Sequence, residues 1–138
     1  HKTASGGLQG LALLEVNNLV SLIKKLKNNN IRIIGTADNG SKTIYDLSSL
    51  NSGVAVILGS EGEGVSHSLL ELCDDICRIP IYGSVECLNV AVATGIILYQ
   101  VQANIKKLTL ITCVLKTRRI ILMNTSMQKK LQTISTQT

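Results

Sequence analysis

The sequence has almost no aromatic residues: it contains no Phe or Trp and three Tyr among 138 residues. Apolar residues nevertheless make up 45% of the chain, so its core has to be built from Ile, Leu, Val and Ala. A chain of this length forms one domain with a proper core and is too short for two of ordinary size. An aliphatic core of this kind is typical of layered α/β domains.

Cysteine is sparse as well, with four residues at positions 73, 77, 87 and 113. The chain lacks the short, loop-rich character of secreted disulfide scaffolds, so we expect reduced thiols in a cytoplasmic protein. Cys73 and Cys77 form the closest pair, but no second Cys or His pair stands at the spacing of a zinc site. We therefore interpret both as small core residues and expect no metal, with a metal site as the minor alternative.

Long uncharged apolar segments are also lacking. The longest apolar tract, residues 108–123, is interrupted by Lys116, Arg118 and Arg119, which are too many charges for a membrane-spanning helix. No secretory leader is recognisable, and His1 rather than Met at the first position suggests a cut end. We expect a cytoplasmic protein that makes no contact with a membrane.

Acidic residues are absent from the end of the chain. Residues 102–138 contain seven Lys or Arg and no acid, whereas residues 1–101 contain seven Lys or Arg and all nine acids. The net charge of +5 therefore belongs to the C-terminal segment. The remainder of the chain gives no electrostatic argument for RNA binding.

The apolar spacing in the first half of the chain predicts a helix and two strands. Residues 16–26 carry apolar positions at helical spacing, with Asn17 or Asn18 available as the N-cap. Residues 31–34 are β-branched and aliphatic enough for a short strand. Residues 54–58 are apolar at every position, which predicts a central strand covered on both faces.

The second half continues the alternation. Ser66 can cap a short helix, a strand is expected over residues 76–81, and residues 88–101 are apolar nearly all round, which predicts a buried helix. Alternating helices and strands predict an α/β fold with a mostly parallel sheet sandwiched by helices.

A glycine-rich segment, Gly59-Ser60-Glu61-Gly62-Glu63-Gly64, follows the central strand, and open parallel sheets bind ligands at the carboxyl ends of their strands. The glycines permit close approach of the backbone to a ligand, but the two glutamates would repel a pyrophosphate and the spacing differs from that of dinucleotide-binding loops. A ligand with a positive centre and no phosphate, such as S-adenosylmethionine, fits better. An ordinary tight turn without a ligand is the alternative.

A second unusual segment runs from Ile79 to Val90 and leads into the last helix. Pro80 has no N–H to donate to a sheet, so the chain must leave regular strand pairing there. Asn89 can cap the following helix, a role that requires no ligand. The loops after Leu58 and Ile81 are expected at the same edge of the sheet, where they can line one site.

Together these segments resemble the SpoU branch of the knotted RNA methyltransferases. Residues 56–65 resemble its motif 2 and residues 79–95 its motif 3, while residues 1–8 are similar to bacterial 23S ribosomal RNA guanosine 2'-O-methyltransferases. The resemblance covers residues 1–106, which we assign to the methyltransferase domain, and leaves residues 107–138 as a basic C-terminal extension. It implies a C-terminal deep trefoil knot and a homodimer.

The resemblance also implies a reaction and its residues. Methyl transfer from S-adenosylmethionine to a ribose 2'-hydroxyl of RNA is expected, with a guanosine of 23S ribosomal RNA as the target and transfer RNA as the alternative. The cofactor-binding residues carried over by the resemblance are Gly59, Ile79, Ile81, Leu88 and Asn89. Asn89 and Glu61 also match polar positions that would support catalysis.

Three features depart from the family pattern. The motif that supplies a catalytic arginine would lie upstream of His1; Arg32 and Arg78 do not match it, and we expect both to be solvated strand or edge residues. Cys87 stands where the family usually has Ser, and a thiol is a weaker hydrogen-bond partner. Residues 107–138 continue past the usual end, either as an RNA-contacting extension or, as we favour, as unrelated appended sequence.

Two other functions stay open on the sequence. A truncated module that binds cofactor or dimerises without methylating would account for the missing motif and for Cys87. A nucleotide-binding oxidoreductase of Rossmann type would rest on the glycines and strand order alone, and Glu61 and Glu63 oppose it.

Overall fold

The computed structural model describes residues 12–48, 53–60, 62–84, 87–104, 110–114 and 119–122. Its elements in chain order are β1 (Ala12–Glu15), α1 (Leu19–Asn28), β2 (Arg32–Thr36), β3 (Lys42–Thr43), the 3-10 turn η1 (Ile44–Asp46), β4 (Val54–Leu58), α2 (His67–Leu70), β5 (Asp75–Arg78), α3 (Val90–Asn104), β6 (Leu110–Val114) and β7 (Arg119–Leu122).

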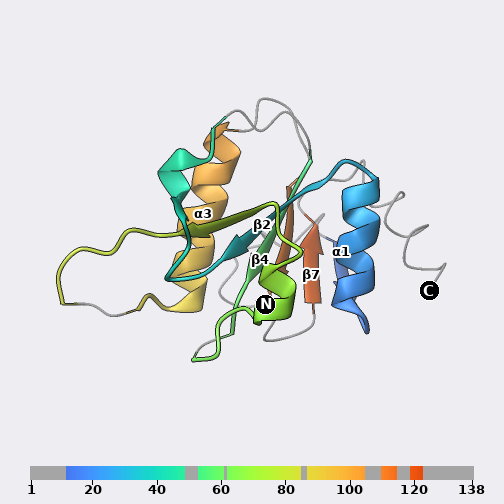
Figure 1. The fold of residues 1–138 in the computed structure, drawn as a ribbon, viewed down its shortest axis with the longest axis horizontal. Helices are drawn as coiled ribbons and strands as arrows, with labels where there is room; N and C mark the ends of the chain where they lie inside the picture. Colours follow the sequence, from blue (N-terminus) through green and yellow to red (C-terminus); the bar gives the residue numbers. More distant parts are fainter. Residues whose placement is uncertain are drawn as a thin grey trace.

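The strands form one sheet in the order β1-β7-β6-β4-β2-β5-β3. The pairs from β6 to β3 are all parallel, and β7 is antiparallel to both β6 and β1. Helices α1 and α3 lie on opposite sides of the sheet (Figure 1). The predicted α/β fold with a mostly parallel sheet between helices is confirmed; the trefoil knot stays a prediction.

Strand β4 is the centre of the core, because all five of its residues are buried. Ala55 and Ile57 pack with Ile33 of β2 on the side of α1, where Ile23 and Leu26 of that helix complete the cluster. The predicted central strand covered on both faces is confirmed.

The opposite face of the sheet is covered by α3 and η1. Val56 and Leu58 of β4 pack there with Ile44 of η1 and with Ile97 and Val101 of α3. Alternate residues of one strand thus serve two apolar layers, as the alternation of side chains across a sheet requires.

Polar residues stabilise both ends of helix α1. Asn18 is the N-cap, and its Oδ1 accepts a hydrogen bond from the Ser21 N–H at 2.9 Å. Lys25 and Lys27 lie in the last turn, where positive charge favours the helix dipole. Asn30 has a φ of 57°, which turns the chain into β2.

Two strand boundaries and one helix cap differ from the sequence prediction. The first predicted strand, over residues 31–34, is β2, which extends to Thr36 because Gly35 pairs with Ile57 of β4. The strand expected over residues 76–81 is β5, which ends at Arg78 ahead of Pro80, as the missing N–H of proline favours. Ser66 is the N-cap residue of α2, but its side chain makes no capping hydrogen bond.

The expectation that α3 is buried nearly all round is wrong. Ile97 and Val101 are buried against the sheet, whereas Val92, Ile96 and Tyr99 are 52%, 37% and 80% exposed. The exposed positions follow helical spacing of four and three residues, so they share one face. Because this apolar helix packs against the protein on one side alone, its other side presents an apolar surface to its surroundings. None of the described helices has the length and apolarity needed to cross a bilayer.

Strands β6 and β7 were not expected from the sequence, which showed no clear pattern there. Strand β6 pairs in parallel with β4 along its whole length, from Val54 beside Leu110 to Leu58 beside Val114. Strand β7 then joins β6 to β1. Without β6, one edge of the fully buried β4 would present unpaired N–H and C=O groups.

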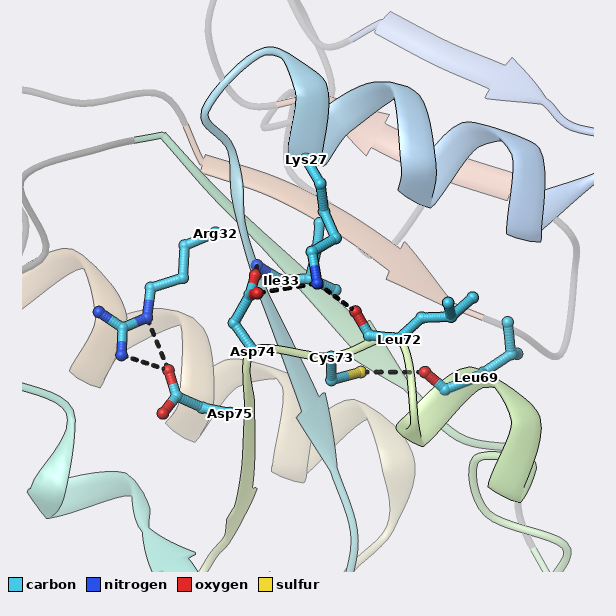
Figure 2. Close-up of polar contacts among 8 residues, drawn as sticks. All are labelled: Lys27, Arg32, Ile33, Leu69, Leu72, Cys73, Asp74 and Asp75. Atoms are coloured by element: carbon cyan, nitrogen blue, oxygen red, sulfur yellow. Dashed lines mark hydrogen bonds and ion pairs between the residues drawn. The ribbon is translucent and has the colours of Figure 1, made fainter.

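A cluster of charges joins the amino ends of β2, β3 and β5. The carboxylate of Asp75, whose side chain is 1% exposed, lies 2.6 Å from Nη2 of Arg32 and 2.5 Å from Nζ of Lys42. Asp74 accepts a hydrogen bond from the Ile33 N–H and pairs with Lys27 at 2.9 Å, as Figure 2 shows together with the Arg32 contact. Arg32 is therefore an ion-pairing residue, not the solvated residue that the sequence suggested.

These contacts set the charge state of Asp75. Burial alone would raise the pKa of its carboxyl group, but the hydrogen bonds from Arg32 and Lys42 outweigh burial, so the pKa is lowered from its ordinary value. Because the folded-state pKa is lowered, the stabilisation is present above the ordinary value of 3.8 and is lost as the pH falls through the folded-state value.

Replacing Asp75 by Asn should lower the free energy of unfolding by about 1–3 kcal/mol at neutral pH, because two charge-assisted hydrogen bonds are lost. Urea unfolding as a function of pH measures this. The Asp75→Asn difference from wild type should shrink as the pH falls below about 4. Asp38→Asn, at an exposed turn, is the matched control. An Asp75→Asn difference that does not change with pH would contradict the account.

Candidate functional site

A cavity of about 710 Å³ opens at the carboxyl ends of β2, β4 and β5. Open parallel sheets bind ligands at this edge, and the volume is in the range of small-molecule sites, about 300–1,000 Å³. Its walls come from three loops, α2 and α3. The lining includes Thr36, Ala37, Asp38, Asn39, Gly59, Glu63, His67, Cys77, Arg78, Ile79, Ile81, Cys87, Leu88 and Ile97.

The first wall is the glycine-rich loop after β4. The chain closes on itself, since Ser60 and Gly64 exchange backbone hydrogen bonds of 3.3 and 3.0 Å. Gly62 and Gly64 have φ of 86° and 67°, values that favour glycine. A Cβ on Gly59 would lie 2.3 Å from the carbonyl carbon of Gly64, so no side chain fits there.

The second wall is the segment between β5 and α3. Ile79, Ile81, Cys87 and Leu88 line the cavity from this side. Regular strand pairing ends before Pro80, as predicted, because β5 ends at Arg78, and α3 begins at Val90. The expectation that the loops after Leu58 and Ile81 line one site is confirmed.

The third wall is the turn after β2, which the sequence reasoning did not include in the site. Thr36, Ala37, Asp38 and Asn39 line the cavity. Thr36 is held toward β4 by a hydrogen bond from its Oγ1 to the Ile57 carbonyl at 3.1 Å. The turn contains ordinary turn residues, and the parallel pairing of β2 with β4 brings it to the same edge of the sheet as the glycine-rich loop.

The floor is apolar and chemically inert. Cys77 of β5 and Ile97 of α3 are 1% and 2% exposed and lie beneath the cavity. Burial raises the pKa of the Cys77 thiol to about 11, so it is protonated at neutral pH. The interpretation of Cys77 as a small core residue is confirmed. Cys87, by contrast, is exposed at the cavity wall.

The charged groups at the cavity are few and mixed. Asp38 and Glu63 bring negative charge, and Arg78 supplies the one Lys or Arg side chain among the described lining residues. Arg78 is exposed, as the sequence analysis expected. His67 of α2 also lines the cavity, and its Nδ1 lies 3.5 Å from Glu71 Oε1.

The cofactor-binding residues predicted from the sequence meet at this cavity with one exception. Gly59, Ile79, Ile81 and Leu88 all line it. Asn89 is not among the lining residues: its Oδ1 accepts a hydrogen bond from the Ala91 N–H at 2.9 Å at the start of α3. The capping role considered from the sequence is confirmed, and its role toward a cofactor stays a prediction. Glu61 lies outside the described residues.

Comparison with known proteins identifies the family of this chain. The model described as the SpoU rRNA Methylase family matches residues 1–99. The chain belongs to this family. It is 40% identical over 99 residues to the 23S rRNA (guanosine-2'-O-)-methyltransferase RlmB of Escherichia coli K12, and 39% identical over 108 residues to the protein of the same name from a Burkholderia species.

Solved structures of the family share the fold of this chain. The SpoU methyltransferase AviRb from Streptomyces viridochromogenes, in complex with the cofactor AdoMet, superposes with a TM-score of 0.63 at 26% identity, over 72% of this chain and 41% of that one. The A. aeolicus TrmH/SpoU tRNA modifying enzyme gives a TM-score of 0.58 at 34% identity, over 64% of this chain and 45% of that one.

The match covers only part of the relatives. The two RlmB proteins match 72% and 78% of this chain, but only 40% and 43% of their own lengths are covered. This chain thus spans about two fifths of the curated relatives it matches. Within the described residues, no group of three or more His, Cys, Asp or Glu side chains could hold a metal ion.

Gly59→Ala should destabilise the folded chain by about 1–3 kcal/mol, because the added methyl group meets backbone atoms of Gly64 and Val65 that cannot move independently. Thermal unfolding measures the change. Gly95→Ala is the matched control, since its Cβ meets nothing within 4 Å and alanine favours a helix by about 0.5–1 kcal/mol. Equal effects of the two substitutions would contradict the close packing of the loop.

Proposed function

We propose that this chain is the cofactor-holding part of an S-adenosylmethionine-dependent RNA ribose 2'-O-methyltransferase. The observation that carries the proposal is the meeting of Gly59, Ile79 and Leu88, distant in sequence, at one cavity. These positions match the cofactor residues of the SpoU pattern. Membership of the family and a related structure that holds AdoMet support the same ligand.

The chemistry of the cavity suits this cofactor. Apolar side chains from Ile79, Ile81 and Leu88 can hold an adenine ring. The backbone at Gly62 and Gly64, where a Cβ would meet nothing within 4 Å, is open to close approach of a ligand. Asp38 and Glu63 favour a ligand with a positive centre over a pyrophosphate. When bound, the cofactor supplies an electrophilic methyl group. This charge pattern does not favour the oxidoreductase considered from the sequence.

The reaction also needs an RNA hydroxyl held in line and its proton removed. We propose supporting roles for Asn89 and Glu61, and that the principal arginine lies outside this chain. A guanosine of 23S ribosomal RNA is the proposed target, supported by the RlmB relatives, and transfer RNA is the alternative, supported by the TrmH/SpoU structure. A methylation assay with each RNA distinguishes an enzyme from a module that only binds cofactor.

The exposed face of α3 supports a homodimer. Val92, Ile96 and Tyr99 form an apolar surface for which the described chain provides no cover, and a second copy can bury it. Family membership likewise supports the trefoil knot, which a crystal structure tracing residues 79–104 would test. The cysteines whose side chains the structure describes, Cys73, Cys77 and Cys87, are free thiols, which is consistent with the cytoplasm as the proposed location.

The chain should bind S-adenosylmethionine saturably in isothermal titration calorimetry. Gly59→Val should abolish binding, because the side chain would displace the loop that lines the cavity. Asn89→Ala should weaken binding. Asn89→Ser keeps a helix-capping side chain, so it distinguishes the loss of the cap from the loss of a contact between the amide and the cofactor. Full affinity in Asn89→Ser would show that the Asn89 side chain caps the helix and makes no contact with the cofactor. A folded wild-type chain that binds no cofactor would overturn the proposal.

Ile96→Glu should convert the dimer to a monomer, because a carboxylate on the apolar face of α3 would be desolvated at the interface. Sedimentation equilibrium measures the mass of each protein. Val20→Glu, a partly exposed position on α1, is the matched control and should leave the dimer intact. A wild-type chain that is monomeric at high concentration would refute the dimer.

A further inference from the structure

Tyr82 is a large aromatic side chain in a position that the fold itself does not explain. It is 86% exposed and lies between Ile81, which lines the cavity, and Gly83, whose φ of 99° turns the chain. The segment after β5 that carries it, in yellow-green in Figure 1, extends as an open loop away from the sheet before α3 begins. Tyr82 therefore contributes little to the described core.

The scarcity of aromatic residues makes this placement informative. The chain has three Tyr and no other aromatic residue of this size, and all three Tyr are exposed, with Tyr45 at 64% and Tyr99 at 80%. Tyr99 belongs to the apolar face of α3. Among the three, only Tyr82 directly adjoins a described residue that lines the cavity.

The charges at the cavity decide what kind of RNA contact fits there. Asp38 and Glu63 oppose a broad phosphate-binding surface, and Arg78 is the single lining Lys or Arg in the described chain. A nucleobase stacked on a tyrosine ring requires no positive surface, because every base has a π-face. One exposed cation is sufficient for one flanking phosphate.

We propose that Tyr82, which directly follows the cavity-lining Ile81, is a stacking platform for an unpaired base of the RNA substrate, with Arg78 contacting a neighbouring phosphate. This inference rests on the proposed function, since it takes RNA as the substrate of this cavity. Stacking beside the cavity would hold a single-stranded nucleotide near the methyl donor while leaving its ribose accessible. The RNA element recognised is therefore an unpaired loop or end.

The test is the affinity of the whole chain for a short, labelled, single-stranded oligoribonucleotide, measured by fluorescence anisotropy with S-adenosylhomocysteine at saturation. Tyr82→Ala should weaken binding by roughly 5- to 150-fold, the usual loss when a stacking ring is removed. Tyr82→Phe keeps the ring and should bind within about twofold of wild type. Tyr45→Ala, which removes an exposed tyrosine away from the cavity lining, is the matched control.

Two further arms separate stacking from charge. On an abasic oligonucleotide of the same length, the difference between wild type and Tyr82→Ala should vanish, because no base is present to stack. Arg78→Ala should weaken binding and lower the salt dependence by about one phosphate contact, whereas Tyr82→Ala should leave that dependence unchanged.

The outcomes distinguish this inference from the proposed function. RNA binding that is equal in wild type and Tyr82→Ala overturns the stacking role, as does a wild-type chain that binds cofactor but no RNA, and both leave the cofactor site intact. A folded chain that binds no cofactor overturns the proposed function. If Tyr82→Ala leaves RNA affinity unchanged but converts a dimer to a monomer in sedimentation, Tyr82 belongs to an interface between copies, and the inference is wrong.

Discussion

The burial of β4 on both faces is the constraint on which the rest of the structure depends. A strand with five apolar residues in succession cannot tolerate water on either face or at either edge. Helix α1 covers one face, α3 and η1 cover the other, and β2 and β6 pair with its two edges. The same strand delivers the chain directly into the glycine-rich loop, so the core and the cavity share one element. The ion pairs of Asp75 stabilise the opposite end of the sheet, away from that cavity.

Local composition was enough to predict the parts of the fold in which the residue types alone determine the structure. The uninterrupted apolar run of β4 and the break at Pro80 each have one physical meaning, and both predictions were close. The cap of α1 was predicted at Asn17 or Asn18, and the structure has it at Asn18. The exposure of α3 could not be predicted in this way. Its residues are apolar on all sides, so the sequence does not distinguish a helix that its own chain buries from a helix that leaves one apolar face exposed.

Only part of the site could be predicted, because only some of its residues are of unusual types. Gly59, Ile79, Ile81 and Leu88 were found because two segments carry unusual residue types in a recognisable order. The turn from Thr36 to Asn39 carries ordinary turn residues, and only the parallel pairing of β2 with β4 brings it to the cavity. Strands β6 and β7 were missed because Lys and Arg interrupt their segment, which hides the apolar pattern of two short strands.

Three loops at one edge of the sheet line one cavity, which is the proposed cofactor site. The most direct measurement is a titration of the isotopically labelled chain with S-adenosylhomocysteine, followed by amide chemical shifts in nuclear magnetic resonance. The account predicts that the largest shifts fall on Thr36 to Asn39, on Gly59 and its loop, and on Ile81 to Leu88, with one common dissociation constant. Shifts confined to one of these loops, or centred on α1, would contradict it.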